Sequence, residues 1–217
     1  MDFSTFSPSS ALITVVLLTL APFAAVMVTS FTKIIVVLSL LRNALGLQGV
    51  PPNLVLNGLA IVLSIYIMYP TTQLVMDSVS NVEDISESTE SMVLAANQAK
   101  EPIRDFMLKH SRLEDREFLL NSLQKLMPPE RQDSLSVNDL VVVIPAFTIS
   151  ELTSAFQIGF IVFLPFIIID LVIANILMAM GMMMLSPTIV SLPFKLLLFV
   201  LVEGWTKLAH GLIMSYL

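Results

Sequence analysis

The sequence predicts an all-α protein of the integral-membrane type, in which long kinked helices form hairpins and carry an amphipathic helical extracytoplasmic insert. Hydrophobic residues make up 56% of the 217 residues and charged residues only 13%, about half the charged share of a soluble domain. Four apolar segments each reach the roughly 20 residues that span a bilayer. The surplus of acidic residues lies in one central polar segment, between two apolar arms.

Residues 1–76 are predicted to form an N-terminal hydrophobic hairpin. The first apolar segment, 11–41, would be about 45 Å long as a straight helix, which exceeds a hydrocarbon core. Pro22 predicts a kink or break within it. We interpret this segment as a retained helix rather than a cleaved signal peptide. Signal peptides begin with a basic region, and the first basic residue here is Lys33.

A turn is predicted between this segment and the second one, which covers about 54–76. Gly46, Gly49 and the pair Pro51-Pro52 mark the turn, and we expect the second helix to start at the prolines.

Residues 77–139 are predicted to form an acidic helical insert. They hold 13 acidic and 7 basic residues, which accounts for the whole net charge of −6. Ser111 and Glu114 have the spacing of a capping box, so we expect a helix to break and restart there and to end at Pro128-Pro129. One face of this helical stretch is apolar and must dock on something: Ile103, Phe106, Met107, His110, Leu119, Leu123 and Leu126.

Residues 140–217 are predicted to form a C-terminal hydrophobic hairpin, from apolar segments 155–185 and 196–217. Pro165 predicts a kink or break in the first of them. Lys195 is expected in the turn between them.

The basic residues near the two short turns predict the orientation. Lys33 and Arg42 flank the first turn, and Lys195 marks the second. Under the positive-inside rule both turns face the cytoplasm, while 77–139 and both termini face outward.

The sequence does not favour catalysis. His110 and His210 belong to no ligand-spaced cluster, there is no cysteine, and no phosphate-loop, serine-hydrolase or zinc-protease motif occurs. We therefore expect no enzyme activity, no metal and no cofactor. The acidic balance also argues against nucleic acid as a partner.

Ionisable residues inside or beside the apolar segments are the candidate functional groups. They either pair between helices or subunits, line a polar path, or lie near helix ends and reach the interface. Asp170 lies between "FIII" and "LVIAN" and needs a buried partner, for which Lys33 and Lys195 are the candidates. The set of charges is Lys33, Arg42, Asp170, Lys195 and Glu203.

The stretch "PAFTISELTSAFQIGF" resembles a signature of the FliP/SctR family, core membrane proteins of the bacterial type III export apparatus. "LPFIIIDLVIANILMAMGMMMLSP", "RNALGLQGVPPNLVLNGLA" and "LPFKLLLFVLVEGW" are also similar to the family, so the likeness covers nearly the whole chain except 80–135. The lack of a basic-start signal peptide is more similar to an injectisome SctR than to a flagellar member. The motif residues are Pro145, Phe147, Ser150, Glu151, Phe156, Gly159 and Asp170.

The resemblance implies a subunit of an export gate in the inner membrane. It implies a pentamer that forms a closed cone with SctS/FliQ-like and SctT/FliR-like proteins, largely above the bilayer, with 77–139 in the periplasm. It also implies contact with a SctU/FlhB-like switch protein, with inner rod or needle proteins and with unfolded substrates. Energy would come from a separate ATPase and the proton-motive force.

The family resemblance also implies a role for "GMMMLSP". Met182, Met183 and Met184 would line the narrowest part of the channel as a gasket, with Gly181 allowing close approach or bending and Pro187 ending the helix. Flexible thioethers repeated around an axis suit this role, although three methionines can also fill a loosely packed core.

Two other functions stay open from the residues. A small secondary transporter or ion channel could use Asp170, Glu151 and Lys33 as a proton relay, although no paired repeats are visible. Alternatively, the chain could be a structural scaffold around a pore that its partners form.

Overall fold

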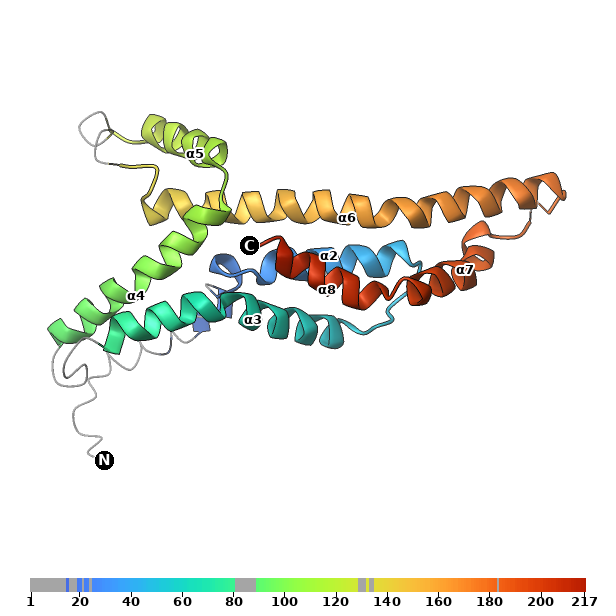
Figure 1. The fold of residues 1–217 in the computed structure, drawn as a ribbon. Helices are drawn as coiled ribbons and strands as arrows, with labels where there is room; N and C mark the ends of the chain where they lie inside the picture. Colours follow the sequence, from blue (N-terminus) through green and yellow to red (C-terminus); the bar gives the residue numbers. More distant parts are fainter. Residues whose placement is uncertain are drawn as a thin grey trace.

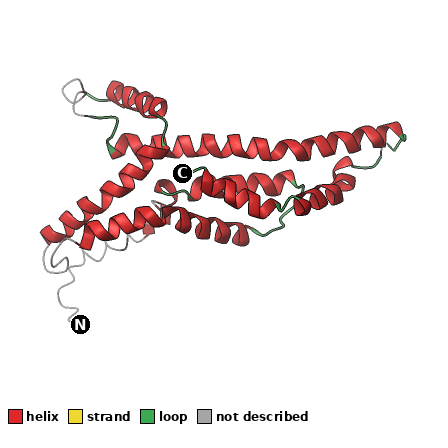
Figure 2. Ribbon diagram, in the orientation of Figure 1, coloured by secondary structure: helices red, strands yellow, loops and turns green. Residues whose placement is uncertain are grey.

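The computed structural model describes residues 15, 19, 20, 22, 23, 25–80, 89–128, 132, 135–182 and 184–217, with the side chains of 89–93 excepted. These residues form helices and no strands, which confirms the all-α prediction for this part of the chain (Figure 2). In chain order the helices are α2 (Phe31–Ala44), α3 (Asn53–Ser80), α4 (Thr89–His110), α5 (Leu113–Leu126), α6 (Leu140–Ala179), α7 (Pro187–Leu201) and α8 (Gly204–Met214). A bend at Thr29 and Ser30 separates α2 from the helical residues before it.

Helix α6 is the long axis of the molecule, and α2, α4, α5 and α7 all pack against it (Figure 1). Its 40 residues make it roughly 60 Å long. Helices α2 and α3 form a hairpin along its first half, and α7 returns along its second half. The insert helices α4 and α5 lie at the opposite end of α6 from the α6–α7 turn.

Helix α2 is the most enclosed element, because it lies between α3 and α6. Its buried apolar residues recur at the spacing of three and four that places side chains on one helical face. They join residues of α3, α6 and α8 in a core whose members are Ile34, Val37, Leu38, Leu56, Ala60, Ala155 and Leu212.

Gly159 sets the distance between α2 and α6. A Cβ atom at this position would lie 2.2 Å from Leu40 Cδ1 and 3.3 Å from Leu40 Cβ, so a larger residue would require Leu40 to shift. The missing side chain of Gly159 therefore lets α2 pack closely against α6 and become buried.

Helix α6 departs from the prediction at Pro165 and at its C-terminal end. The helix continues through Pro165, so of the expected kink or break the break is wrong: one missing N–H bond does not end a helix of this length. It ends at Ala179 rather than near 185. Gly181 has φ 75°, and the N–H groups of Gly181 and Met182 donate to the carbonyls of Met178 and Leu177 at 3.0 and 2.9 Å. This is a Schellman ending, which requires a left-handed residue and therefore favours glycine.

The last apolar segment also differs from the prediction. Pro187 opens α7 instead of ending the preceding helix, since the first helical position needs no N–H donor. Lys195 therefore lies inside α7, not in the turn. The segment then bends by 61° between α7 and α8, where Glu203 adopts φ 53°.

The break between α4 and α5 is confirmed, but the expected capping box is wrong. Arg112 is the N-cap residue of α5 and its side chain makes no capping bond. The hydroxyl of Ser111 donates instead to the carbonyl of Leu108, and the N–H of Arg112 donates to Ser150 Oγ on α6 at 2.9 Å. A tertiary contact thus replaces the local cap.

Two described helices, α3 and α6, are long and apolar enough to cross a membrane, or three if the bent pair α7–α8 counts as one span. Three of the four apolar segments thus correspond to these candidate spans, while much of the fourth, 11–41, lies outside the described residues. The long apolar helices agree with a membrane protein.

Candidate functional site

The centre of the candidate site is a buried ion pair between α2 and α6. Lys33 Nζ lies 2.9 Å from Glu151 Oε1, and the two side chains are only 4% and 2% exposed. A charge pair so far from water persists only when both partners also find further polar contacts. The structure supplies these contacts from the end of the chain.

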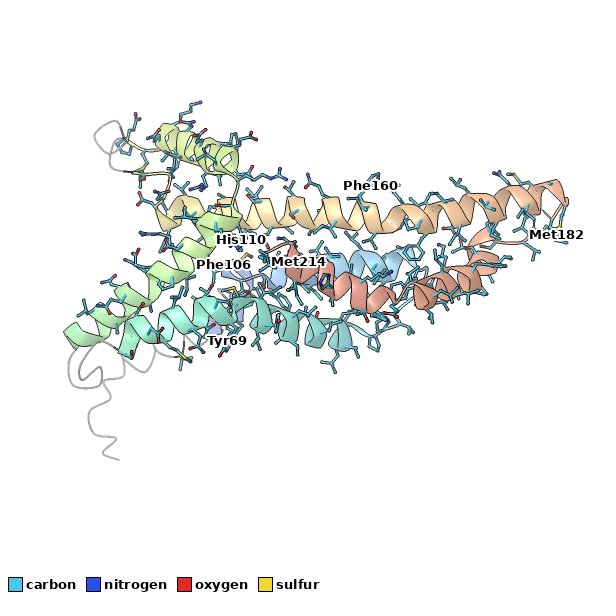
Figure 3. The ribbon with its side chains drawn as sticks, in the orientation of Figure 1. Tyr69, Phe106, His110, Phe160, Met182 and Met214 are labelled. Carbon is cyan, nitrogen blue, oxygen red and sulfur yellow. The ribbon has the colours of Figure 1, made fainter. Side chains whose placement is uncertain are left out.

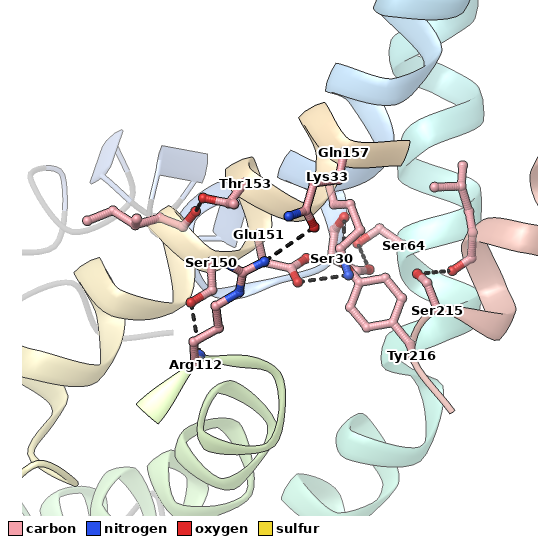
Figure 4. A network of polar contacts seen from close by, with 12 residues as sticks. Ser30, Lys33, Ser64, Arg112, Ser150, Glu151, Thr153, Gln157, Ser215 and Tyr216 are labelled. Atoms are coloured by element: carbon pink, nitrogen blue, oxygen red, sulfur yellow. Dashed lines mark hydrogen bonds and ion pairs between the residues drawn. The ribbon is translucent and has the colours of Figure 1, made fainter. Parts of the chain in front are cut away.

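Tyr216, shortly after the end of α8, contacts both members of this ion pair (Figure 4). Its hydroxyl donates to Glu151 Oε2, and Lys33 Nζ lies 3.7 Å from the centre of its ring. Next to it, Ser30 Oγ donates to Ser64 Oγ at 3.1 Å, which ties the start of α2 to α3. The carboxylate is thus paired by an ammonium and a phenol, and the ammonium also has an aromatic face.

His110 extends the cluster from α4. Its ring lies 5.0 Å from that of Tyr216 and 4.7 Å from that of Phe106. Burial, together with the positive charges of Lys33 and Lys109, lowers the pKa of His110 from 6.5 to about 4. His110 is therefore neutral at physiological pH. It lines an open groove of about 630 Å³ between α3, α4 and the residues after α8, beside Tyr69 and Phe106 (Figure 3).

Ser150, next to Glu151, connects the insert to α6. Its hydroxyl donates to Asp115 Oδ2 at 2.6 Å and accepts from the N–H of Arg112 at 2.9 Å. Arg112 Nη2 also donates to Gln157 Oε1 at 3.3 Å. Two successive residues of α6 therefore hold three regions: Glu151 binds α2 and the residues after α8, and Ser150 binds the α4–α5 junction.

A second ion pair joins α6 to α7. Lys195 Nζ lies 2.6 Å from Asp170 Oδ2 and donates to the carbonyl of Ala44 at the end of α2, at 3.1 Å. Ser191 Oγ donates to Asp170 Oδ1. Of the two candidate partners for Asp170, Lys195 is the one that contacts it. The Asp170 side chain is 35% exposed, so this pair is much more open than the first.

The remaining candidate charges have local roles. Arg42 Nη1 donates to Asn53 Oδ1 at 2.6 Å and to the carbonyl of Pro51 at 3.3 Å, so it fastens the turn between α2 and α3. Glu203 lies exposed at the bend between α7 and α8.

Met182 lies at the far tip of the molecule, in the turn between α6 and α7 to which Met184 also belongs (Figure 3). Met184 is fully exposed and Met182 is 45% exposed, while Met183 lies outside the described residues. Within one chain, Met182 and Met184 therefore do not fill a core. Gly181 has no neighbouring atom within 4 Å of a Cβ placed on it, so its role here is the left-handed turn and not a close helix approach.

Apart from Asp170, which is partly exposed in the second ion pair, the motif residues from the sequence divide into two groups. Phe147, Ser150, Glu151 and Gly159 are buried on the faces of α6 that meet the other helices. Pro145 and Phe156 are exposed on the same helix. The buried members build the core of one chain, and the exposed ones do not.

Sequence reasoning missed the hydroxyl partners of both ion pairs. Ser191 could have been found, because it lies four residues before Lys195 and hence on the same face of α7. Tyr216 carries no such signal, since only the tertiary fold brings it to Glu151 and Lys33.

Sequence comparisons place this chain among known proteins. The sequence profile of the FliP family matches residues 13–212. The chain is 51% identical over 200 residues to the Yop proteins translocation protein R of Yersinia pestis, covering 92% of each chain. It is 48% identical over 211 residues to the hypersensitivity response secretion protein HrcR of Ralstonia nicotianae, covering 96% of this chain and 97% of the relative. It is 44% identical over 221 residues to the flagellar biosynthetic protein FliP of Bacillus subtilis, covering 99% and 97%.

Proposed function

The chain belongs to the FliP family, and from this premise we propose that it is a core membrane subunit of a type III secretion export gate. Its relatives are named for translocation, for secretion and for flagellar biosynthesis, so a component of an export apparatus is the role they share. In the proposed function, copies of the chain form the channel through which unfolded proteins cross the inner membrane, and they seal it at rest.

The observation that carries the proposal is the exposure of the methionine turn. Met184 is fully exposed among the described residues, in the turn between α6 and α7. Repetition of the chain around an axis would bring such turns together and make an apolar constriction. Methionine side chains adapt to irregular partners, so a ring of them can exclude water and ions and still yield to a passing polypeptide.

The length of α6 supports a gate that stands partly outside the bilayer. At roughly 60 Å, it is about twice as long as a hydrocarbon core is thick. The insert helices lie at the end of α6 remote from the methionine turn. We place 77–139 in the periplasm and the rest of the gate in and above the inner membrane.

The uncovered apolar surface of α6 supports an assembly of several chains. Among its exposed side chains are Phe160, Ile161, Ile168 and Leu171, each more than half exposed. We propose a pentamer, with SctS/FliQ-like and SctT/FliR-like proteins on its flanks, a SctU/FlhB-like switch protein near the mouth and inner rod or needle proteins above. We propose an injectisome rather than a flagellum, in line with the relatives that are named for Yop translocation and for hypersensitivity response secretion.

The competing proton relay finds less support. Glu151 and Lys33 pair with each other, whereas Asp170 pairs with Lys195, so the three groups divide between two separate clusters. A transporter would need them on one path.

Photo-crosslinking tests the proposal. A photoreactive amino acid at position 184 is compared with one at Leu126, an equally apolar side chain that is 83% exposed on α5. A substrate fused to a tightly folded domain is stalled during secretion. We expect the substrate to crosslink to position 184 and not to 126. Crosslinks from 184 to neighbouring subunits alone, while the substrate is stalled, would contradict the channel role and favour a scaffold.

A further inference from the structure

Helix α8 has few attachments of its own. Among its 11 residues only Leu212 is buried, and the 61° bend at Val202 and Glu203 separates it from α7. It nevertheless forms one wall of an apolar groove of about 430 Å³, which it shares with α2, α6 and α7. Something outside the helix must therefore hold it in place.

The residue that follows α8 supplies this attachment. Tyr216 is only 6% exposed and reaches three elements at once. Its hydroxyl donates to Glu151 on α6, Lys33 of α2 lies against its ring, and the ring stacks on Phe106 of α4 at 6.0 Å. No other residue after α7 makes a polar side-chain contact with the ion pair among the described residues.

We infer that Tyr216 is a positioning residue that fastens α8 to the core through the Lys33–Glu151 ion pair. The dependence is mutual. Without the phenol, Glu151 Oε2 loses its hydroxyl donor and Lys33 loses its aromatic neighbour, so the pair is less well satisfied. Without the pair, the one hydrogen-bond acceptor left to the hydroxyl of Tyr216 among the described residues is the carbonyl of Ser30, at 3.5 Å.

The chemistry of the contact calls for tyrosine rather than any aromatic residue. Phenylalanine would keep the ring against Lys33 and Phe106 but would remove the donor to Glu151. Leucine would remove both. The inference therefore predicts a graded series, with tyrosine holding α8 most firmly, phenylalanine less and leucine least.

The absence of cysteine from the chain allows a direct measurement. Leu212→Cys places a single thiol at a site that is 1% exposed on α8, and a membrane-permeant maleimide reports how often α8 opens in intact membranes. Leu177→Cys, which is 6% exposed near the end of α6, is the matched control. We expect Tyr216→Leu to accelerate labelling at 212 about tenfold or more and Tyr216→Phe by a smaller factor, with labelling at 177 unchanged.

A second background separates positioning from simple packing. In Lys33→Met/Glu151→Leu the ion pair is replaced by apolar side chains, so the hydroxyl has no carboxylate to bind. Tyrosine at 216 should then lose its advantage over phenylalanine, so that labelling at 212 is no slower with tyrosine than with phenylalanine. Slower labelling with tyrosine in this background would overturn the inference, as would equal labelling of all three variants in the native background. Faster labelling at both 212 and 177 in Tyr216→Phe would also overturn it, because Tyr216 would then support the whole fold rather than α8.

Discussion

Both halves of α6 are apolar, but they have opposite environments. Of the ten buried residues of α6, eight lie in 140–159 and two in 160–179. Of its exposed large apolar side chains, three lie in the first half and nine in the second. The first half carries the core of a single chain, whereas the second half offers its apolar surface to whatever lies outside that chain.

The difference shows that hydrophobicity alone does not say what covers a helix. In the first half, small residues and polar groups accompany the apolar ones, because Gly159 admits α2 and Glu151 binds Lys33. In the second half such features are sparse, and Asp170 remains partly open to its surroundings. An exposed apolar helical surface of this kind is typical of contact with lipid or with other subunits.

Removing the charge of Glu151 should have the largest effect on the stability of the chain. Glu151→Leu leaves the Lys33 ammonium buried without a counter-charge, and we expect a loss of about 3–5 kcal/mol in the free energy of unfolding. Denaturant unfolding of the purified protein in detergent measures it. Lys33→Met/Glu151→Leu should recover most of the loss, since no unpaired charge then remains.

Lys195→Met breaks the second ion pair, which joins α7 to Asp170 in the second half of α6. Asp170 would keep the hydroxyl of Ser191 and its 35% exposure, so we expect a loss of only about 1 kcal/mol. Equal losses for the two ion pairs would contradict the contrast between the halves of α6.

After Glu151→Leu, Gly159→Ala should cause the next largest loss in the free energy of unfolding, because the new methyl group would lie 2.2 Å from Leu40 Cδ1. We expect a loss of about 1–3 kcal/mol as α2 moves away from α6. Gly58→Ala on α3 is the control, since a Cβ there has nothing within 4 Å, and it should be neutral or stabilising by up to about 1 kcal/mol. If both substitutions behaved alike, the close approach at Gly159 would carry no energetic weight.

Acidification should weaken the insert end of the molecule through His110. The pKa of His110 is about 4 in the fold against 6.5 for the free side chain, so the unfolded chain binds the extra proton between these values. Stability is therefore full above pH 6.5 and falls as the pH drops toward 4. Because His110 is half-buried, we expect a loss of only about 1 kcal/mol.

His110→Phe should remove the loss of stability between pH 6.5 and pH 4 that His110 causes. The measurement is the thermal midpoint of both proteins between pH 7 and pH 4. An unchanged pH dependence in the variant would assign the acid sensitivity to other groups.

The sequence predicted much of this architecture, but not the contacts that depend on the tertiary fold. Composition and apolar periodicity predicted an all-α membrane protein, and the motif around Glu151 and Gly159 indicated the family. The break after His110 was expected from a capping box at Ser111 and Glu114, so its position was right although that cap does not form. The sequence narrowed the partner of Asp170 to two lysines, and only the packing of α6 against α7 decides between them. Tyr216 carries no pattern, because its contacts join residues far apart in the chain.

The end of α6 was misplaced for a different physical reason. The apolar character continues through the methionines, so hydropathy extended the helix to about 185. The helix ends where Gly181 takes a left-handed conformation, and a single glycine inside an apolar run is a weak signal.

Gly181→Ala should have the smallest effect, confined to the tip of the second half. A Cβ at this position meets no atom within 4 Å, so its only cost is the left-handed backbone at φ 75°. We expect about 1 kcal/mol of local destabilisation, seen as faster amide exchange at Met182, whose N–H closes the Schellman ending, and almost no change in global unfolding. Gly159→Ala is the counterpart in the packed half, where the same methyl group is resisted by a neighbouring helix. If Gly181→Ala lowered global stability as much as Gly159→Ala does, the methionine turn would belong to the folding core of the single chain and would not be free for an assembly.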